Sequence, residues 1–541
     1  MVERLSSTEP PDGQDNKPRG LLHSSAIVGG ATLVSRVLGL VRDVVLANLV
    51  GATSNADAFF VAFKIPNFLR RLFAEGAFAQ AFIPVFTETR EQGGKAAVQA
   101  LIDRVAGVLG GTLLLLTALT ILAAPVVALV FAPGFSRDPG KLALTADLIR
   151  LTFPYLFLIS MTGFAGGILN AYGRFGVPAL TPVLLNLSLI AAALLLAPGF
   201  EEPVYALALG VFIAGLLQLL FQFPALYGLE LVPRPRWDTA YPGVRRIMTL
   251  MVPALFGVSV SQINLLLDTV LASLLPAGSV SWLYYSDRLT ELPLGVFAIA
   301  IATVVLPTLS ARRARAESGE GDPLFAATLH WALGLVLLIA LPATCALLLL
   351  AEPILATLFQ YGAFAAADVD KAAWSLRAYT LGLSAFMLIK VLAPGYYARQ
   401  DMKSPVRIGI IAMVANMIMN PLFIFPLMWA FELGHVGLAL ATSLSAWLNA
   451  ALLYRGLRRD GTLPSPDISG RASGRLAIAL VVMVVAVGLS LPDPDWWSAT
   501  DAVGRGVRMA GLVAIGGLAY VMVLWLGGLR LSALKNPPET A

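Results

Sequence analysis

The sequence is poor in charge, the property that a water-soluble protein needs most. Only 13% of its 541 residues are charged, whereas 57% are hydrophobic, and the mean hydropathy is +0.78. A soluble chain needs more charge than this to cover its surface. The composition therefore excludes an ordinary soluble protein and indicates a chain embedded in a lipid bilayer.

Cysteine and histidine are also scarce. The one cysteine, Cys345, excludes an internal disulfide and any site built from several cysteines. The three histidines (His23, His330 and His435) lie far apart in the sequence, so they form no zinc-binding pattern. No nucleotide-binding motif occurs either. We expect a transporter rather than an enzyme, with no catalytic residue, no organic cofactor and no nucleic-acid partner.

Long apolar segments are what the sequence has in abundance. A helix needs about 20 mostly apolar residues to cross the hydrocarbon core. The apolar runs are continuous rather than alternating, which indicates helices and not the strands of a barrel. We predict an all-α polytopic membrane protein with about fourteen transmembrane helices, at residues 24–50, 56–90, 98–131, 142–171, 177–197, 203–229, 244–274, 279–311, 324–358, 368–399, 404–430, 434–457, 472–491 and 505–530.

The charge of the connecting segments alternates along the chain. Every second connection is basic, as with Arg312, Arg313 and Arg315 after the eighth predicted helix, and the intervening connections are acidic or hold few cations. Because positive loops favour the cytoplasmic side, both termini are predicted to be cytoplasmic. One pair, Arg137 with Lys141, breaks this alternation.

An internal repeat divides the chain. Residues 82–86 (FIPVF) resemble 305–309 (VLPTL), and 171–174 (AYGR) resemble 396–399 (YYAR), at a spacing of roughly 223–225 residues. The spacing corresponds to six helices, so the halves share one orientation, and the substrate site of such transporters lies between the halves. The predicted parts are a cytoplasmic tail at 1–23, an N-lobe at 24–230, a linker at 231–243, a C-lobe at 244–460, and two helices with a short tail at 461–541.

Charged residues lie within the first, second and eighth predicted helices. Each costs about 2.5–3.5 kcal/mol at the centre of a lone helix, so these side chains must face water, each other or a ligand. Arg36 and Asp43 are seven residues apart and share a helix face, as do Lys64 and Arg71. Pro66 can redirect the residues that follow it. We expect these charges to meet across a central cavity between the two halves.

The type of cation favours an anionic substrate. The cations outnumber the anions by only one, so net charge does not decide the matter, but guanidinium groups match phosphate oxygens bidentately. We expect the substrate to contact Arg36, Arg42, Asp57, Lys64, Arg70, Arg71 and Arg288. We expect structural or gating ion pairs from Asp43, Glu75, Asp287 and Glu291. Roughly a third of the set, Asp57 included, has the alternative of serving only as ion pairs that fix helix packing.

One dense motif carries a family resemblance. Residues 35–43 (SRVLGLVRD) and 56–78 (ADAFFVAFKIPNFLRRLFAEGAF), with 287–289 (DRL) and 291–296 (ELPLGV), closely resemble the MurJ (MviN) family of bacterial lipid II flippases. That family belongs to the multidrug/oligosaccharidyl-lipid/polysaccharide (MOP) exporter superfamily. The resemblance implies two six-helix lobes plus two C-terminal helices. It also implies a central cavity lined by Arg36, Arg42, Arg70 and Arg288, and a functional role for Asp57.

The resemblance also implies a substrate and a route. The substrate would be lipid II, an undecaprenyl-pyrophosphate-linked peptidoglycan precursor, moved from the inner to the outer leaflet of the bacterial cytoplasmic membrane by alternating access. Its lipid chain would follow a groove near 472–530. We expect a monomer whose partners are lipid II and membrane lipids. Exporters of another lipid-linked oligosaccharide or of drugs and metabolites, and a non-transporting scaffold, are the alternatives.

A monovalent cation, Na⁺ or H⁺, is expected to couple to this movement. Asp268 is an isolated carboxylate in the seventh predicted helix, and Asn416, Asn420 and Thr442 supply oxygens from the eleventh and twelfth. These residues resemble a sodium site of some family members, although Asn420 stands where a sodium-binding member can carry a carboxylate. Hydrogen bonds that only join the helices are the alternative.

Overall fold

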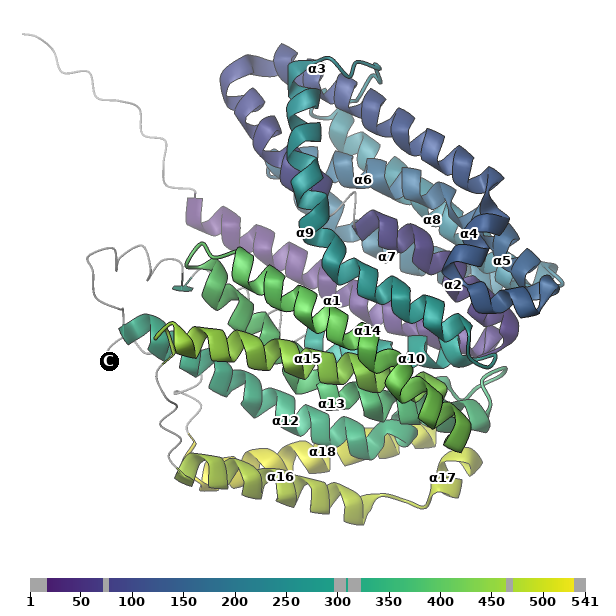
Figure 1. The fold of residues 1–541 in the computed structure, drawn as a ribbon, viewed down its shortest axis with the longest axis vertical. Coiled ribbons are helices and arrows are strands. Elements are labelled where there is room, and N and C mark those ends of the chain that lie inside the picture. The colour runs from purple at the N-terminus through teal and green to yellow at the C-terminus, as the bar shows by residue number, and fades with distance from the viewer. Residues whose placement is uncertain (1–16, 72–76, 296–307, 310–322, 464–469, 530–541) are drawn as a thin grey trace, which may run out of the picture.

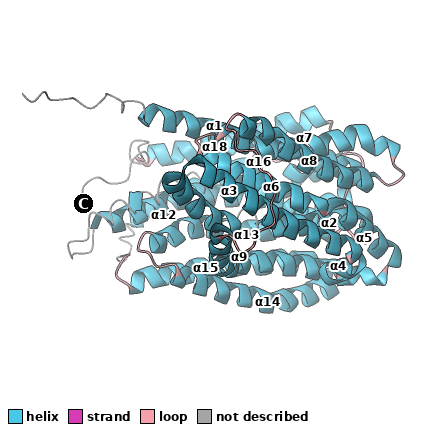
Figure 2. Cartoon of the chain, turned by 90° about the horizontal axis from the view of Figure 1, so that it is seen from above, coloured by secondary structure: helices cyan, strands magenta, loops and turns pink. Residues whose placement is uncertain are grey.

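The computed structural model describes residues 17–71, 77–295, 308–309, 323–463 and 470–529, and within these ranges it is helical with no strand (Figure 2). Ten of the described helices are long and apolar enough to cross a membrane. The predicted all-α multi-pass architecture is therefore confirmed. The number of crossings, the side of the termini and the domain boundaries stay predictions.

The first half of the chain follows the predicted helices but breaks them into shorter pieces. Gly94 has a φ of +68° inside α3, where the second and third predicted helices meet. The fourth predicted helix is divided before Pro154. The elements are α1 (Lys17–Val50), α2 (Ser54–Arg70), α3 (Ala79–Leu122), α4 (Ala124–Phe131), η2 (Pro133–Arg137), α5 (Pro139–Thr152), α6 (Pro154–Ala171), α7 (Gly176–Ala191), η3 (Ala192–Leu196), η4 (Ala197–Gly199) and α8 (Pro203–Tyr227).

The second half also has a helix at each predicted position. The elements are α9 (Pro242–Ser273), α10 (Ser279–Pro293), α12 (Pro323–Phe359), α13 (Ala366–Tyr397), α14 (Lys403–Phe431), α15 (Gly434–Arg459), α16 (Gly470–Ser490), α17 (Pro494–Ala499) and α18 (Ala502–Leu526). Most of the eighth predicted helix beyond α10 lies outside the described residues. The short helix α17, which contains Trp496 and Trp497, was not predicted.

The helices form two groups with a pair of helices on one flank (Figure 1). Helices α1 to α8 form one group, α10 to α15 form the other, and α16 with α18 packs on the outer side of α12. Helix α9 joins the groups. Near its start Val244 and Ile247 are buried against α3, and Arg246 Nη1 lies 2.7 Å from Glu88 Oε2, whereas its second half contacts α14.

The two groups touch closely at one end of the molecule, which we call the seam. It consists of the α1–α2 turn (51–53), residues 274–278 before α10, and the loop 360–365. Ala363 N donates to Asn48 O across the seam at 2.9 Å. Gly51 and Gly362 have φ values of +58° and +54°, and a Cβ on either would strike backbone atoms of the opposite group. By the loop charges, the seam is at the predicted extracellular end.

Candidate functional site

A cavity of about 340 Å³ lies between the two groups of helices, and both supply its charged side chains. A second hollow of about 230 Å³ adjoins it, shares Arg42, Arg288 and Glu291 with it, and adds Arg36. The charged residues of the larger cavity are Arg42, Lys64, Arg70, Arg71, Asp268, Asp287, Arg288 and Glu291. The structure thus brings most of the predicted substrate-contacting residues to one place.

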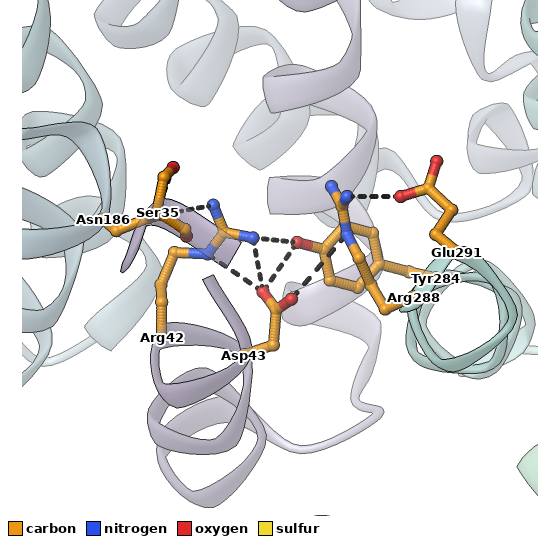
Figure 3. Close-up of polar contacts among 7 residues, drawn as sticks. All are labelled: Ser35, Arg42, Asp43, Asn186, Tyr284, Arg288 and Glu291. Atoms are coloured by element: carbon orange, nitrogen blue, oxygen red, sulfur yellow. Dashed lines mark hydrogen bonds and ion pairs between the residues drawn. The ribbon is translucent and has the colours of Figure 1, made fainter. Parts of the chain in front are cut away.

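Arg42 is held from several directions (Figure 3). Its Nε and Nη2 atoms donate to Asp43 Oδ1 at 2.9 and 2.6 Å. Its Nη1 donates to Asn186 Oδ1 of α7 at 3.0 Å, and its Nη2 to the Tyr284 hydroxyl of α10 at 3.1 Å. Because α1 and α7 belong to one group and α10 to the other, this guanidinium joins the two groups at the cavity wall.

Arg288 faces Arg42 from the other side of the same carboxylate (Figure 3). Its Nε lies 3.7 Å from Asp43 Oδ2, and its Nη1 donates to Glu291 Oε2 at 2.9 Å. The guanidinium also lies over the Tyr284 ring, 5.0 Å from the centroid. One buried carboxylate therefore lies between two arginines, one from each group.

Arg36 lies in the second hollow, next to a glycine. The Arg36 guanidinium lies directly against Gly295, just beyond α10, where a Cβ would overlap its present position. Lys64 Nζ donates to Thr269 Oγ1 of α9 at 3.2 Å. Arg70 and Arg71 both line the main cavity although consecutive residues point about 100° apart on a helix.

Asp57 lies at the seam and not among the residues that line the cavity. Its carboxylate accepts from the backbone N–H of Gly278 at 2.7 Å and from the backbone N–H and hydroxyl of Ser281 at 3.0 and 2.7 Å. Lys141 Nζ lies 3.2 Å away and is itself buried. In this arrangement Asp57 ties the start of α10 to α2 and α5. A substrate contact by Asp57 stays a prediction, and Glu75 lies outside the described residues.

The four residues of the predicted cation site come together, although they are up to 174 residues apart. Asn420 Nδ2 donates to Asp268 Oδ1 at 3.1 Å and to Asn416 Oδ1 at 3.0 Å. Thr442 Oγ1 donates to Asp268 Oδ2 at 3.3 Å. The side-chain oxygen of Asn420 is buried and has no hydrogen-bond partner in the described part of the chain. One carboxylate with several neutral oxygens matches a monovalent cation.

Three important residues were missed by reasoning from the sequence. Asn186 and Tyr284 hold Arg42, but an uncharged polar residue in an apolar helix carries no distinctive pattern. Lys141 did have a signal, because with Arg137 it broke the charge alternation of the loops. Its side chain is buried against Asp57 and lies 4.0 Å from the Phe135 ring centroid, so it is not a loop cation that reports on topology.

The chemistry available in the cavity is binding rather than bond making. Guanidinium groups supply charge-assisted donors for an anion, and the neighbouring carboxylates balance them in its absence. Within the described ranges, no group of three or more His, Cys, Asp and Glu side chains is placed to hold a metal ion.

Fold and cavity together define a multi-pass membrane protein of the transporter class, with a charged cavity between two helical lobes. A solved multidrug resistance MATE family transporter of the MOP superfamily, in an inward-facing conformation, has a similar fold, with a TM-score of 0.63 at 14% identity over 80% of this chain and 96% of its own. This chain belongs to the MurJ family: the family model for "Lipid II flippase MurJ" matches residues 46–497.

Individual relatives agree with this assignment over almost the full length. A probable lipid II flippase MurJ of Vibrio cholerae is 49% identical, covering 96% of this chain and 98% of the relative. One from Haemophilus influenzae is 47% identical, covering 92% and 98%. A solved lipid II flippase MurJ in an inward closed conformation aligns with a TM-score of 0.76 at 25% identity, covering 93% and 98%. The chain is therefore a transporter rather than an enzyme, and a multi-pass protein of the inner membrane.

Proposed function

We propose that this protein moves lipid II from the inner to the outer leaflet of the cytoplasmic membrane, with the cavity between the lobes holding the polar head group. The observation that carries the proposal is the set of guanidinium groups that both lobes direct at one cavity. Membership in the MurJ family supports lipid II as the substrate.

The pyrophosphate of the head group is the part that these arginines suit best. Arg42 and Arg288 flank Asp43. A pyrophosphate that enters between the two arginines would replace the Asp43 carboxylate as the partner of their guanidinium groups. Planar guanidinium groups bind phosphate oxygens in pairs and keep their charge at any working pH. Arg36, Arg70 and Arg71 extend the same surface along the two hollows. No bond in the substrate is made or broken.

The way in which the lobes meet supports movement by alternating access. The seam closes the predicted extracellular end, so the head group enters from the cytoplasmic end. Separation of the seam, with approach of the lobes at the other end, then exposes the head group outwards. The lipid chain stays in the bilayer beside α16 and α18, whose Val481, Leu518 and Trp525 side chains are exposed.

A monovalent cation at Asp268 is the proposed coupling ion. Asp268 and Thr442 both line the substrate cavity, so the cation site and the cavity share one wall. A cation bound beside this carboxylate lowers the cost of keeping its charge in the bilayer interior while the lobes rearrange.

The test is a reconstituted assay of lipid II exposure on the outer leaflet of vesicles. Arg36→Ala, Arg42→Ala and Arg288→Ala should each lower the rate by roughly 10–100-fold, because a hydrogen bond to a charged group contributes about 1.5–3 kcal/mol. Arg150→Ala is the matched control, since Arg150 is exposed and pairs only locally with Asp147. Normal flipping by all three cavity variants, at normal expression, contradicts the mechanism. Repeating the assay in sodium, lithium and potassium buffers tests the coupling ion.

A further inference from the structure

A pair of opposite charges in the C-lobe lies outside the transport cavity. Glu352 is in α12 and Arg377 is in α13, and these two helices pack side by side (Figure 1). The two side chains are 39% and 30% exposed. Tyr379, two residues beyond Arg377, lines the cavity, and residues two apart on a helix point about 160° away from each other. Arg377 is therefore directed away from the cavity.

Apolar side chains flank Arg377 on its own face of α13. Trp374, one turn nearer the seam, is 44% exposed, and Leu381, one turn nearer the cytoplasm, is 45% exposed. Trp447 of α15 is exposed beside them, and its indole N–H donates to Leu381 O at 2.8 Å. Exposed apolar side chains on a membrane-spanning helix contact lipid. The charged pair therefore lies on a surface that faces lipid.

The pair leaves most of its hydrogen-bonding capacity unused. Arg377 Nη2 lies 3.8 Å from Glu352 Oε2, which is too long for a hydrogen bond. Within the described ranges neither side chain makes a hydrogen bond, and the Arg377 guanidinium lies over the Trp374 ring, 5.1 Å from the centroid. Polar groups without partners are costly in lipid. A further partner that offers both an acceptor and a donor is therefore expected here.

The depth of the pair matches the outer head-group layer. Arg377 is 11 residues after the start of α13, about 16 Å along the helix from its predicted extracellular end. Helix α13 has 32 residues and is about 48 Å long, whereas the hydrocarbon core is about 30 Å thick. Both ends of α13 therefore extend into head-group layers, and the long Arg377 side chain reaches the outer layer from just inside the core.

The repeated architecture does not require these charges. At a spacing of 225 residues, within the range of the repeated segments, the N-lobe has Val127 in place of Glu352 and Thr152 in place of Arg377. The N-lobe thus packs with uncharged residues at these positions. Since charges are costly in apolar helices, their presence in the C-lobe alone indicates a role beyond joining two helices.

We propose that Glu352, Arg377 and Trp374 form a binding site for an outer-leaflet phospholipid whose zwitterionic head group carries a primary amine, as in phosphatidylethanolamine. The Arg377 guanidinium binds the lipid phosphate, the Glu352 carboxylate accepts from the ammonium group, and Trp374 packs at the interface between head group and chains. A choline head group has no N–H to donate, and a glycerol head group has no cation. The site does not depend on which substrate the cavity transports.

The first experiment measures the thermal stability of the purified full-length protein in detergent with added phospholipid. Phosphatidylethanolamine, phosphatidylcholine and phosphatidylglycerol with the same acyl chains are compared. For wild type, half-maximal stabilisation should need a roughly tenfold lower concentration of phosphatidylethanolamine than of the other two, because each of these lacks one charge-assisted hydrogen bond. Equal effects of the three lipids, or no effect of any, overturn the proposal.

Variants assign the preference to the pair. Glu352→Gln and Arg377→Met should each raise the phosphatidylethanolamine concentration roughly tenfold. Glu352→Leu/Arg377→Leu leaves no uncompensated charge, so it should fold even where a single variant does not, and it should show no preference among the lipids. Lys390→Met is the matched control, since Lys390 is an exposed cation on another face of α13. A wild-type preference in the double variant overturns the proposal.

Photo-cross-linking then locates the lipid. Phosphatidylethanolamine with a diazirine at the start of one acyl chain should attach to the peptides that contain Glu352 and Arg377 in wild type, and not in the double leucine variant. Attachment elsewhere overturns the assignment of the site. Attachment at these peptides by a lipid II probe, but not by phosphatidylethanolamine, overturns the choice of ligand.

Discussion

At the scale of single residues, the cavity depends on a few buried charges that compensate one another. Asp43 is almost fully buried and lies between Arg42 and Arg288 (Figure 3). Removing one partner from such a set leaves a charge without compensation in a medium of low dielectric constant, at a cost of about 3–5 kcal/mol. We therefore expect the cluster to stay intact until an anion of comparable charge replaces the carboxylate, which is the role proposed above for the pyrophosphate.

Asn186 should prove to be a positioning residue for Arg42. Asn186→Leu removes the amide that accepts from Arg42 Nη1. The guanidinium therefore loses one of the hydrogen bonds that orient it. We expect the concentration of lipid II needed for half-maximal flipping to rise roughly tenfold, since a charged hydrogen bond contributes about 1.5–3 kcal/mol.

Two further variants define the cause of that effect. Ser188→Ala, on the same helix and also buried, should leave flipping unchanged. Asn186→Asp keeps an acceptor and should restore most of the affinity for lipid II. Equal effects of Asn186→Leu and Ser188→Ala would show that α7 packing, and not Arg42, is what matters.

The charged members of the site could be predicted from the sequence because charge is rare and costly in apolar helices. Arg36, Arg42, Lys64 and Arg288 stood out for that reason alone. Tyr284 could not be found in this way, because a tyrosine costs little within a membrane helix and its partners come from the other lobe. The location of Asp57 at the seam was likewise hidden, since its three hydrogen bonds come from Gly278 and Ser281, which carry no sequence signature.

At the scale of helices, one buried arginine fixes α18 to α12. The Arg505 side chain donates to the carbonyl oxygens of Thr500 at 2.8 Å, Ala356 at 2.9 Å and Gln360 at 3.3 Å. Ala356 and Gln360 lie at the C-terminal end of α12, where carbonyls have no partner within the helix and the helix dipole favours a cation. The Arg505 guanidinium thus caps the C-terminal end of α12 and attaches the outer helix pair, α16 and α18, to the C-lobe.

Replacing Arg505 should loosen this attachment, and the reactivity of the single cysteine, Cys345, would report the change. Cys345 in α12 is partly buried by the cluster of α16 and α18 side chains that includes Met483 and Tyr520. In Arg505→Met, a small membrane-permeant maleimide should label Cys345 roughly tenfold faster than in wild type. The α12 carbonyls lose charge-assisted bonds of about 1.5–3 kcal/mol each.

Arg508→Met is the control for this labelling. Arg508 is on the same helix but is exposed and donates to Ser490 O of α16 at 2.6 Å, away from α12. Its substitution should leave the labelling rate at the wild-type value. Unchanged labelling in Arg505→Met as well would mean that apolar packing alone holds the outer pair.

The existence of helices was predictable because apolar runs of span length are unambiguous, but their internal breaks were not. The predicted helix at 142–171 is two helices, α5 and α6, because Pro154 begins a new one. Proline is tolerated within many other helices here, such as α2 and α9. Which prolines end a helix depends on neighbouring helices, and the sequence does not reveal these neighbours.

At the scale of the whole molecule, polar bonds at the seam help to hold the two lobes together. Asp57 is central to them, because it receives three hydrogen bonds from α10 and its start, and it pairs with Lys141 from its own lobe. The internal repeat predicted the two lobes, whereas the way in which they meet depends on loop conformations such as Gly51 and Gly362 and was not predicted.

Asp57→Ala should therefore favour separation of the lobes at this end. Spin labels at Ser136 and Ala367, both exposed and on opposite lobes, would report the distance by pulsed electron resonance in a Cys345→Ala background. We expect one short distance for the parent protein and an added, longer distance for Asp57→Ala, with a population on the order of tenfold higher.

Glu202→Ala provides the comparison, because Glu202 accepts from Asn55 within the same lobe at the same end. It should keep the parent distance. An unchanged distance in Asp57→Ala would show that the backbone contacts of the seam hold the lobes without this carboxylate.

The seam has a pharmacological meaning as well. It is formed by three short loops at the end of the protein predicted to face away from the cytoplasm, so a water-soluble compound or antibody fragment can reach it without crossing the membrane. A ligand that bridges the loop at 360–365 and the turn at 51–53 would prevent the two lobes from separating at the seam. Such an inhibitor need not resemble lipid II and would not compete with it for the arginines.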